Sequence, residues 1–184
     1  MRCSTKEITD TEKVVRLLKT CAVGRLGTVG KDGYPMVKPL NFVHADRAIY
    51  FHSAQEGEKI EDIMRDNRVC FEADLPIAMV KSRTSPCRAE YLYQSVIVKG
   101  RATIIHDEKE KLQALSLLMA KYQPEGGYGE FPAEKLRITG VVRIDIEEMT
   151  GKEDLGDESL KKKAEKALEE GVPLPIVLYR DEPS

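Results

Sequence analysis

The chain has 184 residues, 41% of them hydrophobic and 33% charged, a composition typical of one folded domain and not of a disordered chain. The formal net charge is −2 and the basic residues are scattered, which argues against nucleic acid as the main partner. The four cysteines form no C-x-x-C pair, so the spacing of a zinc ribbon is missing and a disulfide framework is not expected.

The N-terminus, Met1 to Asp10, has no apolar leader, and no apolar run reaches the length of a membrane span. We therefore expect a reduced, cytoplasmic protein that has no membrane partner and no metal site.

The first elements predicted are a helix and a hairpin. Thr9 to Glu12 fits a capping box with Glu12 at N3, and helical spacing continues to Thr20. Two β-favouring runs then cover Ala22 to Val29 and Tyr34 to Val43. The segment Gly30 to Gly33 between them contains Asp-Gly, which predicts a hairpin.

Four further β-favouring runs follow. They cover Ala48 to Phe51, Arg68 to Ala73, Tyr91 to Ile105 and Thr139 to Met149. Gly100 lies inside the third of these runs and predicts a bulge or bend. Six short strands with helices between them predict a mainly β fold with helices, a small antiparallel barrel under helical cover.

The clearest helix runs from Asp107 to Tyr122, with Asp107 and Glu110 as a cap. Its predicted apolar stripe consists of Leu112, Leu115, Leu118, Met119 and Tyr122. The composition changes after residue 152. We predict a barrel domain over residues 1–152 and a charged extension over 153–184, first helical and then extended.

The third strand leads into a helix through hydrogen-bond donors. Ile49 to Phe51 is followed by His52, Ser53, Gln55 and Lys59. Side-chain donors beside a helix N-terminus suit a phosphate monoester. In the alternative interpretation, Ser53 or Gln55 caps the helix and Lys59 lies on a solvated face.

Two other stretches are candidates for ligand contact. Lys38-Pro39-Leu40-Asn41-Phe42 combines proline with asparagine in a strand, which leaves ladder positions open to a planar polar ligand; the alternative is a proline-protected edge strand. Tyr93-Gln94-Ser95-Val96 opens the long strand with polar groups, which meet a ligand or form a wet strand end.

No catalytic residue stands out. His44 and His106 fall at predicted turns beside aspartates and are interpreted as surface residues. Cys21, Cys70 and Cys87 are interpreted as small core residues and not as nucleophiles.

Taken together, these segments resemble the pyridoxamine 5'-phosphate oxidase-like, FMN-binding split-barrel superfamily, and most closely its nitroimidazole-reductase-type branch. The resemblance runs in consistent order from about Ile8 to Lys152. The matching stretches are Gly24-Arg25-Leu26-Gly27-Thr28, Asp32-Gly33-Tyr34-Pro35, Pro39-Leu40-Asn41-Phe42, Tyr50-Phe51-His52-Ser53-Ala54 with Gly57 and Lys59, Val69-Cys70-Phe71-Glu72, Tyr93-Gln94-Ser95-Val96 with Gly100, and Glu148-Met149-Thr150-Gly151-Lys152.

The resemblance implies a six-stranded antiparallel split β-barrel that forms a homodimer with FMN at the interface. It implies that the phosphate and ribityl chain are held by His52, Ser53, Ala54 and Lys59. It places Lys38, Pro39, Leu40 and Asn41 along the isoalloxazine ring. It assigns Gln94 and Ser95 to the partner subunit or to the facing strand.

One departure from the family pattern bears on the substrate. The oxidase proper holds phosphate with an arginine-rich clamp, whereas Lys59 is the only cation in this phosphate segment. This argues against pyridoxamine phosphate oxidation itself, and the family pattern does not explain the extension after Lys152.

The leading functional hypothesis is an FMN-dependent oxidoreductase that passes electrons from NADH or NADPH to a small nitroaromatic or quinone-like acceptor. The first alternative is a non-catalytic flavin-binding module for storage or sensing. The second is a haem-handling split-barrel protein, in which His52, His44 or His106 would bind iron.

Overall fold

Nine strands and five α-helices follow one another in residues 4–180, the part of the chain that the computed structural model describes. The strands are β1 (Glu7–Ile8), β2 (Gly24–Val29), β3 (Pro35–Leu40), β4 (Val43–Ala45), β5 (Ala48–Ala54), β6 (Arg68–Lys81), β7 (Glu90–Ile104), β8 (Thr139–Asp154) and β9 (Ile176–Tyr179). The helices are α1 (Thr11–Thr20), α2 (Glu58–Arg65), α3 (Glu108–Tyr122), α4 (Ala133–Ile138) and α5 (Glu158–Glu170). None of these helices is long and apolar enough to cross a membrane.

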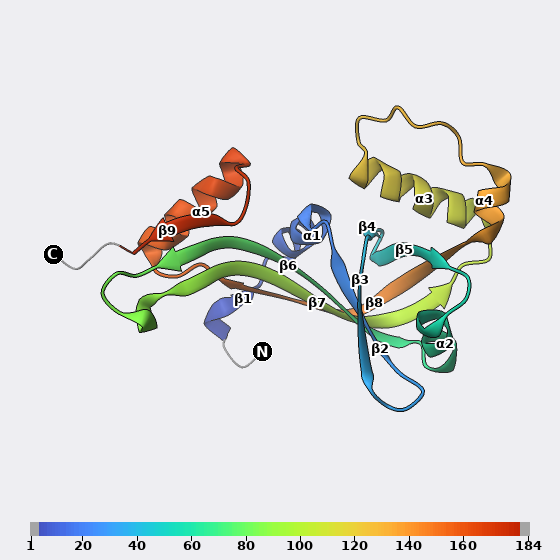
Figure 1. Cartoon of the computed structure of the whole chain (residues 1–184), viewed down its shortest axis with the longest axis horizontal. Helices are drawn as coiled ribbons and strands as arrows, with labels where there is room; N and C mark the ends of the chain where they lie inside the picture. The colour runs from blue at the N-terminus through green and yellow to red at the C-terminus, as the bar shows by residue number, and fades with distance from the viewer. Residues whose placement is uncertain (1–3, 181–184) are drawn as a thin grey trace.

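The strands form one sheet in the order β3-β2-β6-β7-β8-β5-β4, with β1 added to β8 and β9 to β6. The six predicted strands correspond to β2, β3, β5, β6, β7 and β8. Every pair is antiparallel except β6 with β9. The predicted fold class, an antiparallel split barrel with helical cover, is confirmed, although the sheet does not close (Figure 1).

Several local predictions are confirmed and one is shifted. The β2–β3 turn is closed by a hydrogen bond from Gly30 N to Tyr34 O of 2.7 Å, as the Asp-Gly signal predicts. The cap of α1 is Asp10 instead of Thr9, because its carboxylate accepts from the backbone N–H of Glu12 and Lys13. Glu12 therefore occupies N2, and the predicted capping box does not form.

The predicted bulge lies where β7 passes β8. The register between these strands shifts between Lys99 and Gly100, so that Glu147 on β8 has no opposite residue. A Cβ atom on Gly100 would stand 2.3 Å from the carbonyl oxygen of Asp145, so the close strand approach requires glycine.

The main core lies under α1, between the inner faces of the strands. Phe42, Phe51 and Phe71 are fully buried there, and the rings of Phe42 and Phe71 meet edge to face with centroids 4.8 Å apart. Two smaller cores flank it, one under α5 and one under α3. Figure 1 shows α5 and β9 at one end of the long strands and α2, α3 and α4 toward the other.

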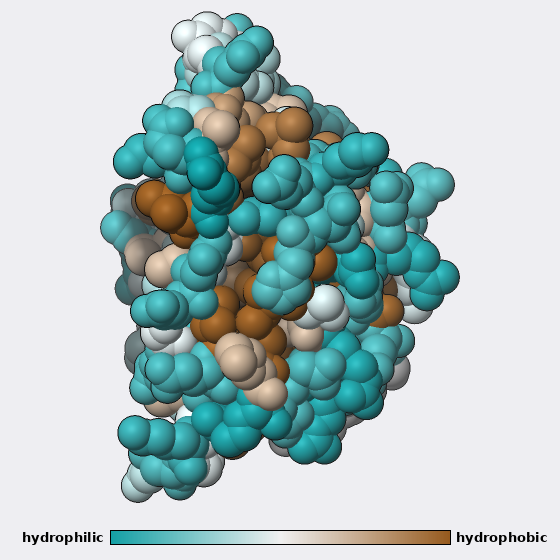
Figure 2. Space-filling model, turned by 90° about the vertical axis from the view of Figure 1, so that its right-hand side faces the viewer, coloured by the Kyte–Doolittle hydropathy of each residue, from teal (hydrophilic) through white to brown (hydrophobic). Residues whose placement is uncertain are grey.

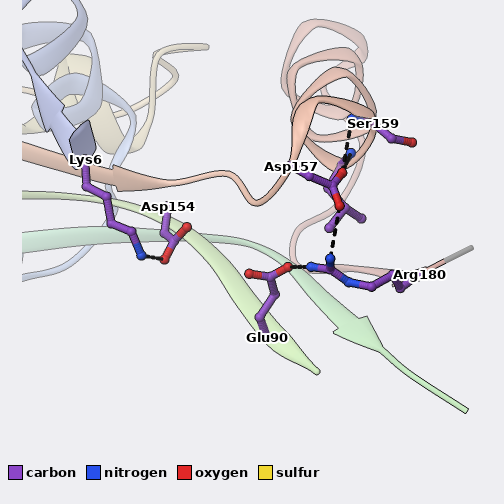
Figure 3. A network of polar contacts seen from close by, with 7 residues as sticks. Lys6, Glu90, Asp154, Asp157, Ser159 and Arg180 are labelled. Carbon is purple, nitrogen blue, oxygen red and sulfur yellow. Dashed lines mark hydrogen bonds and ion pairs between the residues drawn. The ribbon is translucent and has the colours of Figure 1, made fainter. Parts of the chain in front are cut away.

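Ion pairs of Arg180 hold the segment that follows β9 against the sheet (Figure 3). Arg180 forms an ion pair with Glu90 at the start of β7 and another with Asp157, at 3.0 Å. Asp157 also caps α5 by accepting from the backbone N–H of Ser159 and Leu160. β8 itself runs to Asp154, which pairs with Lys6. The division of the chain after residue 152 stays a prediction.

Candidate functional site

The predicted ligand-binding residues occupy three places in the structure. Lys38 of β3 contacts Glu58 at the start of α2, the helix that also carries Lys59. Asn41 and His52 line a cavity under α3 and α4. Gln94 and Ser95 lie in the first half of β7, toward α5. The chain by itself therefore does not bring all of them together.

Lys38 and Lys59, hereafter the lysine pair, form the most charged part of the site. Lys38 projects from the inner side of β3, where its Nζ atom pairs with the Glu58 carboxylate of α2 at 2.5 Å. The Lys59 Nζ atom lies 5.3 Å from the ring centroid of Phe51. Burial, and then the positive charge of Lys38, lower the pKa of Lys59 below its ordinary value. Two cations thus share a half-buried position, which favours an anionic ligand.

The start of α2 borders this lysine pair. Its N-cap is Gly57, with φ of 111°, and no side chain caps the helix. Ser53 donates to its neighbour's carbonyl, Ala54 O, and Gln55 donates to Arg137 O. The alternative in which Ser53 or Gln55 caps the helix is therefore wrong, and the first N–H groups of α2 are left to a ligand or to water.

β5 continues further than predicted. It runs through His52 and Ser53 to Ala54, because these residues pair with Val141, Gly140 and Thr139 of β8. His52 and Ser53 therefore stand on a strand, on alternating sides, whereas Gln55 follows the strand and Lys59 lies on α2. His52 is exposed on the side of α3, whereas Ser53 is half-buried on the opposite side.

A buried carboxylate holds α2 against the sheet. Asp62 is 2% exposed; it accepts from Thr28 Oγ1 at 2.9 Å and pairs with Arg65 at 2.8 Å. The Arg65 contact, followed by the hydrogen bond from Thr28, lowers the pKa of Asp62. Arg65 also donates to Val29 O, so β2 and α2 are fixed relative to each other.

The second place is a cavity of about 400 Å³, hereafter the α3–α4 cavity. Its apolar lining is Leu115, Leu118, Met119, Tyr122, Phe131 and Leu136, and its polar lining is Asn41, His52, Lys135 and Thr139. The Tyr122 hydroxyl is already engaged, because it accepts from Phe42 N at 2.9 Å and lies 2.7 Å from Ala22 O. Tyr122 therefore offers its ring to the cavity and fixes the segment that follows Asn41.

The third place holds the residues furthest from the lysine pair along the strands. Gln94 is 7% exposed, and its amide donates to Glu153 at 2.8 Å. It lines a groove between α1 and α5, and Ser95 pairs with Asp74 and Lys152 on the neighbouring strands.

Three further residues predicted for the site have apolar side chains, so they can offer a ligand only backbone groups or packing contacts. Pro39 is exposed on the outward side of β3 opposite Arg25, and Leu40 packs against the main core. Ala54 ends β5 at the surface. β3 is the last strand of the sheet order, so one of its edges has no strand neighbour within residues 4–180.

The histidines lie in three different surroundings. His52 lines the α3–α4 cavity and His106 lines another one. His44 is half-buried, and burial, then Lys19 and Lys121, lower its pKa despite an opposing effect of Asp46. Within residues 4–180, no group of His, Cys, Asp or Glu side chains could hold a metal ion.

Several site residues escaped the sequence reasoning. Glu58 directly precedes Lys59, so its charge could have been counted in the phosphate segment. Phe131 and Leu136 fall between the predicted helix that ends at Tyr122 and the predicted strand that begins at Thr139, where no helix was predicted and the structure has α4. No local signal connects them to Asn41 or His52, because only the tertiary fold brings them near.

The antiparallel sheet, which ends at β3 and does not close, defines a split-barrel protein, and the lysine pair lies beside β3. The chain belongs to the pyridoxamine 5'-phosphate oxidase family, whose profile matches residues 10–153. The predicted resemblance is thereby confirmed. None of the functionally curated proteins matches the chain significantly.

Solved structures agree with this assignment. A candidate 5-nitroimidazole antibiotic resistance protein from Bacteroides thetaiotaomicron is 27% identical, with a TM-score of 0.71 over 79% of this chain and 85% of that chain. An FAD-binding protein from Mesorhizobium loti is 25% identical, with a TM-score of 0.58 over 81% of this chain and 97% of that one. A flavocytochrome from Azotobacter vinelandii, 23% identical with a TM-score of 0.74 over 88% and 77% of the two chains, shares the fold.

Proposed function

We propose that the protein binds FMN and acts in the cytoplasm as an FMN-dependent oxidoreductase, with NADH or NADPH as reductant and a nitroaromatic or quinone-like compound as acceptor. The observation that carries this proposal is the lysine pair at the uncapped N-terminus of α2, inside the segment matched by the family. The relatives named above for FAD binding and nitroimidazole resistance support a flavin and a nitroaromatic acceptor.

The residues present fit a flavin phosphate. Lys38 and Lys59 supply positive charge, and the first turn of α2 supplies backbone N–H groups. Ser53 and Ala54 stand at the end of β5, just before this turn. The Glu58 carboxylate opposes binding, because it already pairs with Lys38 and has to give way to the phosphate.

The ring of the flavin would lie along Lys38, Pro39, Leu40 and Asn41. β3 has a strand neighbour on one side only, so its free edge can offer backbone groups to the polar rim of the ring. The segment is held in place by the Tyr122 hydroxyl, which accepts a hydrogen bond from Phe42 N at 2.9 Å.

We further propose a homodimer with one FMN in each of two interface sites. Gln94 and Ser95 lie away from the lysine pair in their own chain, so a partner subunit is needed to bring them to the flavin. The outward face of the sheet exposes Val29, Val37 and Ile97 by 46%, 63% and 45%, which suits an isologous contact. Sedimentation velocity at micromolar concentration should give a dimer, and a monomer would contradict this part of the proposal.

Bound FMN would supply the hydride chemistry, and the protein would supply binding, orientation and exclusion of water. In the net reaction the nicotinamide loses a hydride, and a quinone that gains this hydride and one solvent proton becomes a hydroquinone. No side chain of the chain has to act as acid or base. The lysine pair holds the phosphate, and the β3 edge orients the ring.

A titration tests the proposal. We expect the full chain to bind FMN more tightly than riboflavin, because only FMN of the two has the phosphate. FAD is titrated in the same assay for comparison with FMN. NADH or NADPH should then reduce the bound flavin under anaerobic conditions, and the loss of its visible absorbance band measures this reduction. Absence of binding would overturn the proposal. Binding without bleaching would leave the non-catalytic flavin module as the function.

A further inference from the structure

Two adjoining cavities lie on the side of the molecule that carries α2 and α4. Their volumes are about 480 and 330 Å³, and both are lined by Glu108, Lys111 and Arg137, so together they are hereafter called the α2–α4 groove. Figure 2 views this side and shows brown, apolar residues reaching the surface between hydrophilic ones. Among the described residues, neither member of the lysine pair lines the groove, so it is separate from the proposed phosphate site.

Lys111 of α3 places a buried cation in the lining of both cavities. The residue is 8% exposed, and its Nζ atom donates to Leu136 O at 2.8 Å. An ammonium group has three hydrogen-bond donors, and within residues 4–180 Leu136 O is the only acceptor for this one. No carboxylate among these residues forms an ion pair with Lys111. A buried charge without a counter-charge is costly, so an anionic ligand is favoured here.

Arg137 of α4 is a second cation without an ion-pair partner among the described residues. It is exposed, and its Nε atom donates only to Ala133 O, on its own helix, at 3.4 Å. Gln55 holds this end of α4 by donating to Arg137 O. Glu108 is the only acidic residue in the described lining. The groove therefore has two cations against one carboxylate and is positive on balance.

The larger of the two cavities has an apolar wall beside these cations. The wall consists of Ile60 and Met64 of α2 with Ile104 and Ile105 at the end of β7. Met64 is 72% exposed although it lines a cavity, so an apolar ligand would cover it and remove it from water. The volume of about 480 Å³ falls within the range of roughly 300–1,000 Å³ found for small-molecule sites. The groove therefore has room for a hydrocarbon chain next to its cations.

We propose that the α2–α4 groove binds a small amphipathic carboxylate, with its carboxylate group at Lys111 and Arg137 and its hydrocarbon chain along the apolar wall. The two cations disfavour a positively charged ligand, and the wall favours a ligand with a chain over an inorganic anion. Such a ligand contacts α2, α3 and α4 at once, so it stabilises the folded chain. The inference goes beyond the proposed function and does not depend on flavin binding.

The test uses octanoate as the probe, and calorimetric titration of the full chain without flavin as the readout. Octanol and octylamine carry the same chain with an uncharged and a positively charged head, respectively. We expect octanoate to bind at least about 10-fold more tightly than octanol, because hydrogen bonds between charged groups are the stronger ones, and octylamine to bind more weakly than either. Saturating octanoate should also raise the Tm of the chain.

Substitutions at exposed positions locate the bound octanoate. Arg137→Glu replaces a cation of the groove with a carboxylate and should weaken octanoate binding at least about 10-fold. The matched control is Lys135→Glu, which makes the same charge change on the same helix but in the lining of the α3–α4 cavity, and it should change the Kd by less than about 2-fold. Met64→Gln makes the apolar wall polar and should weaken binding about 3-fold or more.

Exposed side chains are replaced because they can change without unfolding the chain, unlike Lys111, whose hydrogen bond holds α4. The lysine pair also attracts anions, so Lys38→Ala with Lys59→Ala is a further control, which should leave the Kd of octanoate unchanged. Equal affinities for octanoate and octanol, no binding at millimolar octanoate, or a loss of affinity in either control in place of Arg137→Glu would overturn the inference. A chain that binds octanoate in the expected pattern but fails to bind FMN would overturn only the proposed function.

Discussion

The two ends of the long strands β6 and β7 use charge in opposite ways. At the end covered by α5 and β9, Arg180 lies between two carboxylates, Glu90 and Asp157, and Lys6 pairs with Asp154 (Figure 3). At the end near α2, the two cations of the lysine pair stand together with only Glu58 as an ion-pair partner among the described residues.

We interpret the ion pairs at the α5 end as stabilising the fold and the lysine pair at the α2 end as serving ligand binding. Opposite charges in contact hold a segment in place, whereas like charges in a half-buried position destabilise the free protein. A ligand that neutralises them binds the folded state and stabilises it. The charges at the α5 end are thus paired within the chain, whereas we propose that an anion pairs with the lysine pair at the α2 end.

Removing the lysine pair should give the largest effect. A hydrogen bond to a charged group contributes about 1.5–3 kcal/mol, so Lys38→Ala with Lys59→Ala should weaken FMN binding by about 100-fold or more. Thermal stability of the free protein should stay the same or rise, because a repulsion is lost. Fluorescence titration measures the affinity. Lys166→Ala on α5, which removes an exposed lysine paired with Glu170, is the control that should change neither quantity.

Removing the buried carboxylate of α2 should give the next largest effect, a loss of stability. Asp62→Ala leaves Thr28, which is 5% exposed, without its partner, at a cost of about 2 kcal/mol in the free energy of unfolding measured in urea. The folded-state pKa of Asp62 is lowered, so its contribution is present above the ordinary value of 3.8 and is lost as the pH falls through the lowered pKa. Equal stabilities of variant and parent at pH 7 would contradict this role.

Much of the barrel could be predicted because the signals were local. The Asp-Gly turn and the cap at Asp107 depend on residues close in sequence, and both are present in the structure. The face of α3 was predicted less well, since Leu112 is 43% exposed while Lys111 is buried. Lys111 can be buried because its amine reaches Leu136 O, a partner 25 residues away.

The sequence indicated individual residues of the candidate site but not their arrangement in space. Sequence order indicated which residues have ligand-binding chemistry, but the distribution of His52 and Ser53 to opposite sides follows from the extension of β5 along β8. That extension depends on a strand from the other end of the chain. The ion pair between Glu58 and Lys38 likewise depends on β3 approaching α2, which no local pattern indicates.

Breaking the C-terminal ion pairs should have a smaller, purely structural effect. The side chains of Arg180 and Glu90 are 21% and 29% exposed, so Arg180→Ala should lower the free energy of unfolding by about 1 kcal/mol. For a chain of this length that corresponds to a fall in Tm of about 2–4 °C, measured by calorimetry. FMN affinity should not change, and a large loss of affinity would show that the two ends are coupled.

The smallest effect is expected from replacing Glu58, at the end of the long strands near α2. Glu58→Gln removes the carboxylate that pairs with Lys38, so FMN should bind about 2–5-fold more tightly, as expected for an ion pair whose partners are 30% and 57% exposed. Riboflavin, which lacks the phosphate, should bind as before, and a parallel gain for riboflavin would contradict competition at the lysine pair. The pKa of Lys59 is lowered, so its positive charge is lost at a lower pH than that of an ordinary lysine. The preference for FMN over riboflavin should therefore decline as the pH rises through that lowered pKa, in the parent and in the variant alike.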